Sequence, residues 1–218
     1  MKPDPSEHGI IGPEETRPSR IVPLCFHDKD LMDFISHGLW GSIAFGRKNR
    51  WSFGLAFAIG MAPDLLSFGV LYIAAALGLS SKPDFSHGTP PESTIPQYVH
   101  QLYNYTHSFV VFLVIFVFVW LFLKRPVWEL GAWGLHVLAD VPLHTYAFFP
   151  TPVLWPFSNW KFDGWQWMTP SILIPNFMLL SLLYAWYIRH LYLANKKEQT
   201  QQKSVSNYPL QGKQIAKP

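Results

Sequence analysis

The feature that most constrains this chain is a run of fifteen uninterrupted apolar residues at positions 109–123, which ends at a basic turn and a proline. The other apolar stretches with few charges cover residues 31–45, 51–79, 127–142 and 171–193. In lipid, a helix satisfies every backbone polar group within its own segment. The pattern therefore predicts an all-α integral membrane protein, a bundle of about five transmembrane or re-entrant helices.

The composition agrees with a membrane protein. Hydrophobic residues make up 49% of the 218 residues and charged residues only 14%, whereas a soluble domain carries about 25% charged residues. The net charge of +3 is too small to favour nucleic acid as a partner, and membrane lipids are the expected surroundings. The single cysteine, Cys25, excludes an internal disulfide framework.

Polar segments flank the apolar region and interrupt it. Residues 1–30 contain repeated prolines, which predicts a polar N-terminal arm. Residues 31–194 form the predicted membrane helical domain, and residues 195–218 a basic, Gln-rich, disordered tail. Two turn-rich stretches are predicted loops, 80–101 and the aromatic-rich 146–167.

Basic residues predict the orientation of the helices. The clusters after 31–45, after 109–123 and after 171–193 fall on one side when five segments alternate, and the positive-inside rule places that side in the cytoplasm. The stretch 51–79 would rise about 43 Å as one helix, more than the roughly 30 Å of hydrocarbon. This predicts a break, tilt or protrusion at Ala62 and Pro63.

Several ionisable residues fall inside the apolar segments, where their default interpretation is functional. At about 1.5 Å per residue, five of them reach a shared band in the outer half of the bilayer. These are His37, Asp64, His107, His136 and Asp140. His136 and Asp140, four residues apart, lie on one face of a helix, and His144 continues the spacing although Pro142 should re-aim it.

Imidazole and carboxylate groups at this spacing suit zinc or another borderline divalent metal. Thr106 could cap or orient the neighbouring His107. The same residues also permit other interpretations: hydrated groups at the interface, a hydrogen-bonded His–Asp pair without metal, or an ion or proton pathway. Glu129, close to the basic turn after 109–123, is predicted to form an interfacial ion pair.

Five short motifs occur in a recognisable order. They are Ser-His-Gly-Leu-Trp-Gly (36–41), Gly-Met-Ala-Pro-Asp (60–64), Tyr-Thr-His-Ser (105–108), Leu-His-Val-Leu-Ala-Asp (135–140) and Leu-Trp-Pro-Phe-Ser (154–158). Together they resemble the YdjM-like family of membrane-bound metal-dependent hydrolases, over about residues 33–167. The order of candidate ligands is also similar to that of zinc-dependent phospholipase C.

The resemblance implies a ligand set of His37, Asp64, His107, His136 and Asp140, with His144 as an extra ligand. It also implies that Asp140 could bridge two metals. The chain departs from the phospholipase in two ways, because it has no counterpart of the N-terminal Trp ligand and no later His-x-x-x-Glu pair. One or two divalent ions, zinc foremost, are therefore expected.

The function implied is a membrane-bound metal-dependent hydrolase that directs an activated water at a lipid or lipid-linked phosphoester. Asp64 would be a metal ligand or the catalytic base. The aromatic loop 146–167 would lie at the lipid headgroups and guide the substrate, or merely anchor the bundle. Two alternatives remain: an ion or proton transporter, and a non-enzymatic membrane protein with a structural metal site.

Overall fold

The computed structural model describes residues 28–206, except 82 and 85–88. Within these residues the chain consists of helices and connecting segments and contains no β-strand. The predicted all-α class is therefore confirmed for this part of the chain. The N-terminal arm was predicted for residues 1–30. Residues 1–27 lie outside the described residues, and residues 28–30 begin a helix.

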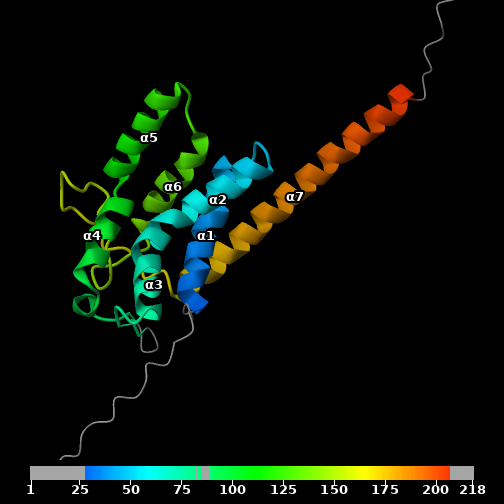
Figure 1. Cartoon of the computed structure of the whole chain (residues 1–218). Helices are drawn as coiled ribbons and strands as arrows, with labels where there is room; N and C mark the ends of the chain where they lie inside the picture. The colour runs from blue at the N-terminus through cyan, green and yellow to red at the C-terminus, as the bar shows by residue number, and fades with distance from the viewer. Residues whose placement is uncertain (1–27, 82, 85–88, 207–218) are drawn as a thin grey trace, which may run out of the picture.

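The helices follow one another along the chain as labelled in Figure 1. They are α1 (Asp28–Phe45), α2 (Arg50–Asp64), the π-helical turn η1 (Leu65–Gly69), α3 (Val70–Ala76), the 3-10 turn η2 (Glu92–Thr94), α4 (Gln97–Thr106), α5 (Phe109–Leu123), the 3-10 turn η3 (Trp128–Leu130), α6 (Gly131–Asp140) and α7 (Pro170–Ser206).

Helices α1, α2 and α6 pack against one another in the middle of the molecule. Glycine allows their close approach: a Cβ atom on Gly60 of α2 would lie 2.7 Å from the carbonyl oxygen of His37 in α1. Gly134 allows α6 to approach α5 closely in the same way, since a Cβ atom on Gly134 would lie 2.6 Å from the Phe112 ring. These contacts bring the polar residues of several helices close together.

Two helical stretches in the described residues are long and apolar enough to cross a membrane, Arg50–Ala76 and Pro170–Ser204. Helices α4 and α5, bent by 55° at their junction, make a third if they act as one span. Two or three crossings are compatible with a membrane protein. The count of five membrane segments and their orientation remain predictions.

The predicted break at Ala62 and Pro63 takes a milder form in the structure. The helix continues through Pro63 and changes to the π-helical turn Leu65–Gly69 directly after Asp64. Proline has no N–H to donate, so the helical hydrogen-bonding pattern is already interrupted at this point, and π-helical turns often occur at functional positions in helices. The irregularity lies beside a candidate ligand.

Two of the predicted boundaries are wrong. The loop predicted for 80–101 ends early because α4 begins at Gln97, and its Val99 and Tyr103 are buried in the hydrophobic core. The tail predicted to be disordered from 195 is helical as far as Ser206, because Gln, Lys and Glu favour helix and no Gly or Pro interrupts them. Residues 207–218 lie outside the described residues.

Helix α7 crosses the molecule diagonally and extends beyond the other helices (Figure 1). It packs against α1, where the indole Nε1 of Trp40 donates to Asn176 Oδ1 at 2.8 Å and the hydroxyls of Ser42 and Tyr184 lie 2.8 Å apart. None of the predicted ligands belongs to α7, so the candidate site is built by the other helices.

Candidate metal centre

The structure brings all six predicted ligand residues into one buried cluster. Their exposed fractions are 4% for His37, 6% for Asp64, 0% for His107, 1% for His136, 1% for Asp140 and 8% for His144. We refer to these six residues as the His/Asp cluster. Polar groups buried to this extent need partners, because an unpaired one is costly in a low-dielectric interior.

Each ligand residue lies at a position that its helix defines. His37 is in α1, opposite the close approach of Gly60, and Asp64 is the last residue of α2. His107 lies in the bend between α4 and α5, where the Ser108 side chain caps α5 by accepting from the Val111 N–H. Because the chain bends here and does not continue as one helix, the His107 side chain lies in the interior.

Three ligand atoms form a compact triangle. His136 Nε2 lies 3.1 Å from His107 Nε2 and 3.1 Å from Asp140 Oδ2, and His107 Nε2 lies 3.4 Å from Asp140 Oδ2. Asp64 Oδ1 lies 3.3 Å from His107 Nε2 and 3.7 Å from His136 Nε2. Donor atoms about 2.0–2.1 Å from a tetrahedral zinc are about 3.3–3.4 Å apart, so these spacings match a shared cation.

The second carboxylate oxygen of Asp140 faces the remaining two imidazoles. Asp140 Oδ1 lies 3.0 Å from His37 Nε2 and 3.8 Å from His144 Nε2. Two overlapping triads, one of His37, His136 and Asp140 and one of Asp64, His107 and His136, have ligand atoms within 4.8 Å of one another and could hold a metal ion. Asp140 thus has one oxygen on each side of the cluster.

Hydrogen bonds on the far side of two rings determine their tautomers. His136 Nδ1 lies 2.7 Å from the carbonyl oxygen of Gly60, which can only accept, so Nδ1 carries the proton. His107 Nδ1 lies 2.9 Å from Thr106 Oγ1, whose own hydroxyl donates to the Leu102 carbonyl at 2.9 Å. Thr106 Oγ1 therefore accepts from His107 Nδ1–H.

In the neutral form of both rings, lone pairs therefore point towards each other. A neutral ring with its proton on Nδ1 has no hydrogen on Nε2, and the Nε2 atoms of His107 and His136 lie 3.1 Å apart. The carboxyl groups of Asp64 and Asp140 lie in the same buried volume. A divalent cation between these atoms would bind both lone pairs and balance the negative charge of the carboxylates.

Three groups around the cluster were not singled out from the sequence. They are the Gly60 carbonyl, the Tyr103 ring stacked on His107 at 3.8 Å, and the Trp133 indole that donates to the Thr106 carbonyl at 2.6 Å. Tyr103 lies four residues before His107, so helical spacing could have found it if α4 had been recognised. The predicted orienting role of Thr106 agrees with its hydrogen bond to His107.

His144 reaches the cluster from a turn, because α6 ends at Asp140. Its backbone N–H donates to the Asp140 carbonyl at 3.1 Å. The aromatic loop holds this turn from the other side: Gly164 N–H donates to the His144 carbonyl and Trp165 N–H to the Pro142 carbonyl, both at 2.8 Å. A Cβ atom on Gly164 would meet the Pro142 carbonyl oxygen, so a glycine suits this close contact.

Glu129 lies away from the cluster, beside basic residues. It accepts a hydrogen bond from the Ser52 hydroxyl at 2.5 Å. This bond, with the nearby charges of Lys48 and Arg125, holds the pKa of Glu129 below its usual range. An interfacial ion pair was predicted for Glu129; the structure gives it a hydrogen bond from Ser52 and nearby basic charges, and the ion pair itself stays a prediction.

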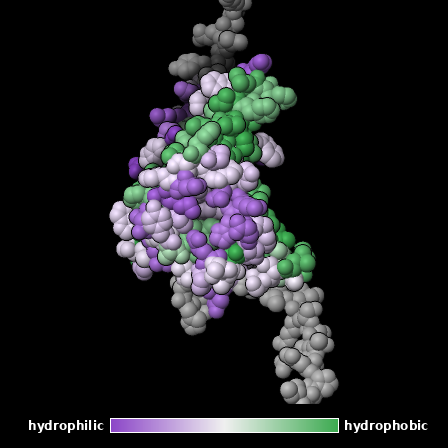
Figure 2. Space-filling model, turned by 90° about the vertical axis from the view of Figure 1, so that its left-hand side faces the viewer, coloured by the Kyte–Doolittle hydropathy of each residue, from purple (hydrophilic) through white to green (hydrophobic). Residues whose placement is uncertain are grey.

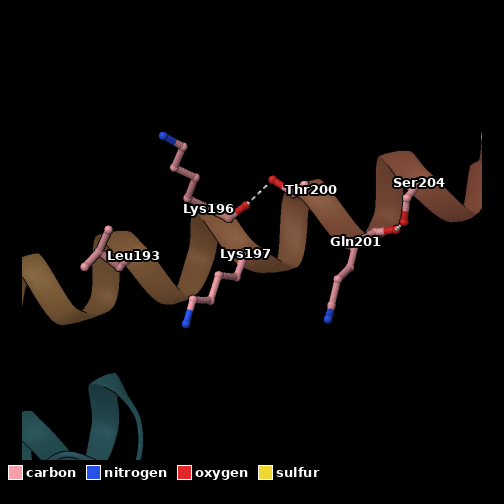
Figure 3. A pocket seen from close by; sticks show the side chains of 6 residues that line it. All are labelled: Leu193, Lys196, Lys197, Thr200, Gln201 and Ser204. Atoms are coloured by element: carbon pink, nitrogen blue, oxygen red, sulfur yellow. Dashed lines mark hydrogen bonds between the residues drawn. The ribbon is translucent and has the colours of Figure 1, made fainter.

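The end of α7 is polar but encloses no comparable site. Figure 3 shows Lys196 pointing away from Lys197 and Gln201 on the opposite side of the helix, with Thr200 donating to the Lys196 carbonyl at 2.9 Å. All of these side chains come from one helix. They therefore form a hydrophilic continuation of α7, in contrast to the cluster, which several helices enclose.

The described structure defines a class of protein: an all-helical chain, compatible with insertion in a membrane, with a buried His/Asp cluster that could hold a metal ion. Comparisons with protein-family models, curated proteins and solved structures found no match. The resemblance to membrane-bound metal-dependent hydrolases therefore stays a prediction that rests on the sequence motifs alone.

Proposed function

We propose that this protein is a membrane-bound metal-dependent hydrolase. Its His/Asp cluster binds one or two divalent cations, preferably zinc, and its substrate is a lipid or lipid-linked phosphoester. The observation that supports this most is the pair of imidazole Nε2 atoms, 3.1 Å apart, whose protons are held on Nδ1 by Gly60 and Thr106. Imidazole rings in this tautomer present the Nε2 lone pair that a metal ion requires.

The ligand types favour zinc over magnesium or calcium. Four of the six residues in the cluster are histidines, whereas magnesium and calcium prefer oxygen ligands. A bound zinc would lower the pKa of a water and stabilise negative charge on a phosphoryl oxygen. Hydrolysis then forms a bond from the water oxygen to phosphorus and breaks one P–O bond of the ester.

The residues of the chain have separate tasks in this proposal. His107, His136 and Asp140 form the triangle of shortest spacings and would hold the cation. Asp64, which lies at the end of α2 beside the π-helical turn, would complete the coordination or take the proton of the water. His37 and His144, on the other oxygen of Asp140, would hold a second cation if two are bound.

The near-complete burial of the cluster favours a second candidate, a structural metal site. None of the six residues is exposed by more than 8%, whereas a catalytic metal needs an open coordination position and a route for substrate. In a structural role the cation would join α1, α2, α6 and the bend before α5. Chelation separates the two candidates, because it would then unfold the helices instead of only stopping hydrolysis.

The first experiment measures bound metal. The chain is purified in detergent without added metal, and its metal content is determined by mass spectrometry. We expect about one or two zinc ions per chain in the wild type, and none in a folded His136→Ala/Asp140→Ala variant. A matched control, His190→Ala/Asp163→Ala, removes the same residue types outside the cluster and should keep the metal.

The second experiment tests hydrolysis of phospholipids in mixed micelles, with helical content followed by circular dichroism. Loss of phosphoester hydrolysis after chelation, with helical content retained and activity restored by zinc, would support the hydrolase. Retained metal binding without hydrolysis of any phospholipid, together with unfolding on chelation, would favour the structural site. A wild-type chain without stoichiometric metal would overturn both candidates.

A further inference from the structure

The aromatic loop 146–167 carries an unusual outer surface for a connecting segment. Its exposed large side chains include Phe157 at 85%, Trp165 at 66% and Trp160 at 52%. Tyr146, Leu154 and Phe162 are also exposed. An exposed group of this kind indicates a contact surface, because soluble proteins rarely leave several large aromatic side chains together in water.

The loop carries only two charged residues, Lys161 and Asp163, and the phenol and backbone of Tyr146 hydrogen-bond to both of these residues. Asp163 accepts from the Tyr146 N–H at 2.9 Å, and the Tyr146 hydroxyl donates to the Lys161 carbonyl at 2.9 Å. The surface therefore combines large aromatic rings with polar indole N–H and phenol groups. Trp and Tyr with this character prefer the boundary between hydrocarbon and water in a membrane.

The attachment of the loop places it at such a boundary. Ser108, at the start of α5, donates to the Trp155 carbonyl, and the Phe109 N–H donates to the Val153 carbonyl at 3.0 Å. Helix α5 rises about 22 Å over its 15 residues to the basic turn at its other end. With that turn at one edge of a hydrocarbon layer of about 30 Å, the start of α5 lies about 8 Å from the other edge, and the attached loop extends towards it.

The surface colouring agrees with this placement. Figure 2 shows hydrophobic side chains gathered over α5 in the upper part of the face, above a mainly pale and hydrophilic region that includes the loop and α4. Tyr105 of α4 is 55% exposed and packs edge-on against Trp155, with ring centroids 4.5 Å apart. The exposed aromatic surface of the loop therefore extends on to α4.

We propose that the exposed aromatic face of the loop, residues 154–165, lies in the headgroup region of one bilayer leaflet. The occupant of this surface is lipid. The same loop hydrogen-bonds the carbonyls of Pro142 and His144, so it connects the lipid headgroups to the turn that presents His144 to the cluster. This inference does not depend on hydrolysis or on a bound metal, and its test is separate from those above.

The test measures the depth of spin labels in phosphatidylcholine liposomes. The single native cysteine is removed by Cys25→Ser, and labels are attached in the full chain at Phe157→Cys and, separately, at Trp165→Cys. Both side chains are more than half exposed, so their replacement leaves no cavity. Collision with oxygen, which concentrates in lipid, is compared with collision with a water-soluble nickel chelate.

Two further positions calibrate the measurement. Phe118→Cys, on the exposed side of α5, should lie in the hydrocarbon, and Gln201→Cys, on the polar end of α7, should lie in water. We expect oxygen-to-nickel ratios at 157 and 165 severalfold above that at 201 and below that at 118. A ratio equal to that at 201 would overturn the proposal. Labels immobilised and inaccessible to both reagents would also overturn it, by indicating a protein partner or a second copy.

Discussion

At the scale of single residues, the metal-binding capacity of the cluster depends on groups that contact the imidazole rings at Nδ1 and not at the candidate ligand atom Nε2. The Gly60 carbonyl and the Thr106 hydroxyl hold the protons of His136 and His107 on Nδ1. Without these acceptors, each ring would be free to place its proton on Nε2, where it would block a metal. The hydrogen bonds at Nδ1 thus determine whether Nε2 of each ring can bind a metal.

Thr106→Val tests this dependence. Valine has the shape of threonine but no hydroxyl, so His107 Nδ1–H loses its acceptor, and we expect zinc affinity to fall about 10–100-fold. Thr106→Ser keeps the hydroxyl and should bind almost as the wild type does. Affinity is measured by competition with a chromophoric chelator. Equal affinities for the Val and Ser variants would contradict the proposed role.

Ser52→Ala tests the interaction at Glu129. The hydrogen bond lowers the pKa of Glu129 in the folded state, so its stabilisation is present above the ordinary pKa of the carboxyl group and is lost as the pH falls through the folded value. We therefore expect Ser52→Ala to lower the melting temperature more at about pH 7 than at about pH 3. An equal loss at both pH values, or an unchanged pH dependence in Glu129→Gln, would argue against this account.

At the scale of helices, the cluster depends on how closely α1 and α2 approach. A Cβ atom on Gly60 would lie 2.7 Å from the His37 carbonyl oxygen and 3.1 Å from the Gly38 Cα, and both are backbone atoms that cannot rotate away. The absence of a side chain at position 60 therefore sets the distance between the helices that carry His37 and Asp64.

Gly60→Ala should separate these helices and lower the free energy of unfolding by about 1–3 kcal/mol. Gly54→Ala on the same helix is the matched control: its Cβ atom meets nothing within 4 Å, so the loss of glycine flexibility should stabilise the helix by about 0.5–1 kcal/mol. Unfolding in mixed detergent micelles with increasing dodecyl sulfate gives both values. Equal effects of the two substitutions would contradict the packing argument.

At the scale of the whole molecule, the basic ends of the helices point towards the same side. The turn between α1 and α2, the turn after α5 and the end of α7 are all in the upper part of Figure 1. This agrees with the arrangement used to predict a cytoplasmic side, because basic residues are retained there.

Cysteine labelling tests the orientation. In a Cys25→Ser background, an impermeant maleimide should modify Lys48→Cys, Lys124→Cys and Lys197→Cys only in inside-out vesicles. Ser93→Cys, an exposed position before α4, should react only in right-side-out vesicles. Labelling of all four positions from the same side would show that the predicted arrangement is wrong.

The sequence by itself determined the helical class, since long apolar runs leave helix as the simplest way to satisfy the backbone in lipid. It also identified the six residues of the cluster, because ionisable side chains are costly in apolar segments. It missed α4, whose buried Val99 and Tyr103 alternate with polar residues that resemble a loop. It also ended α7 too early, because a polar sequence does not by itself distinguish a solvated helix from a disordered tail.

Only the tertiary structure decided how the six residues relate to one another. The bend before α5, the contact of Gly60 with α1 and the hydrogen bonds to His107 and His136 all join residues far apart in the chain. Spacing along one helix predicts which side chains share a face, and it accounts for His136 and Asp140. Distances of about 3 Å between atoms of different helices depend on packing, which local sequence patterns do not encode.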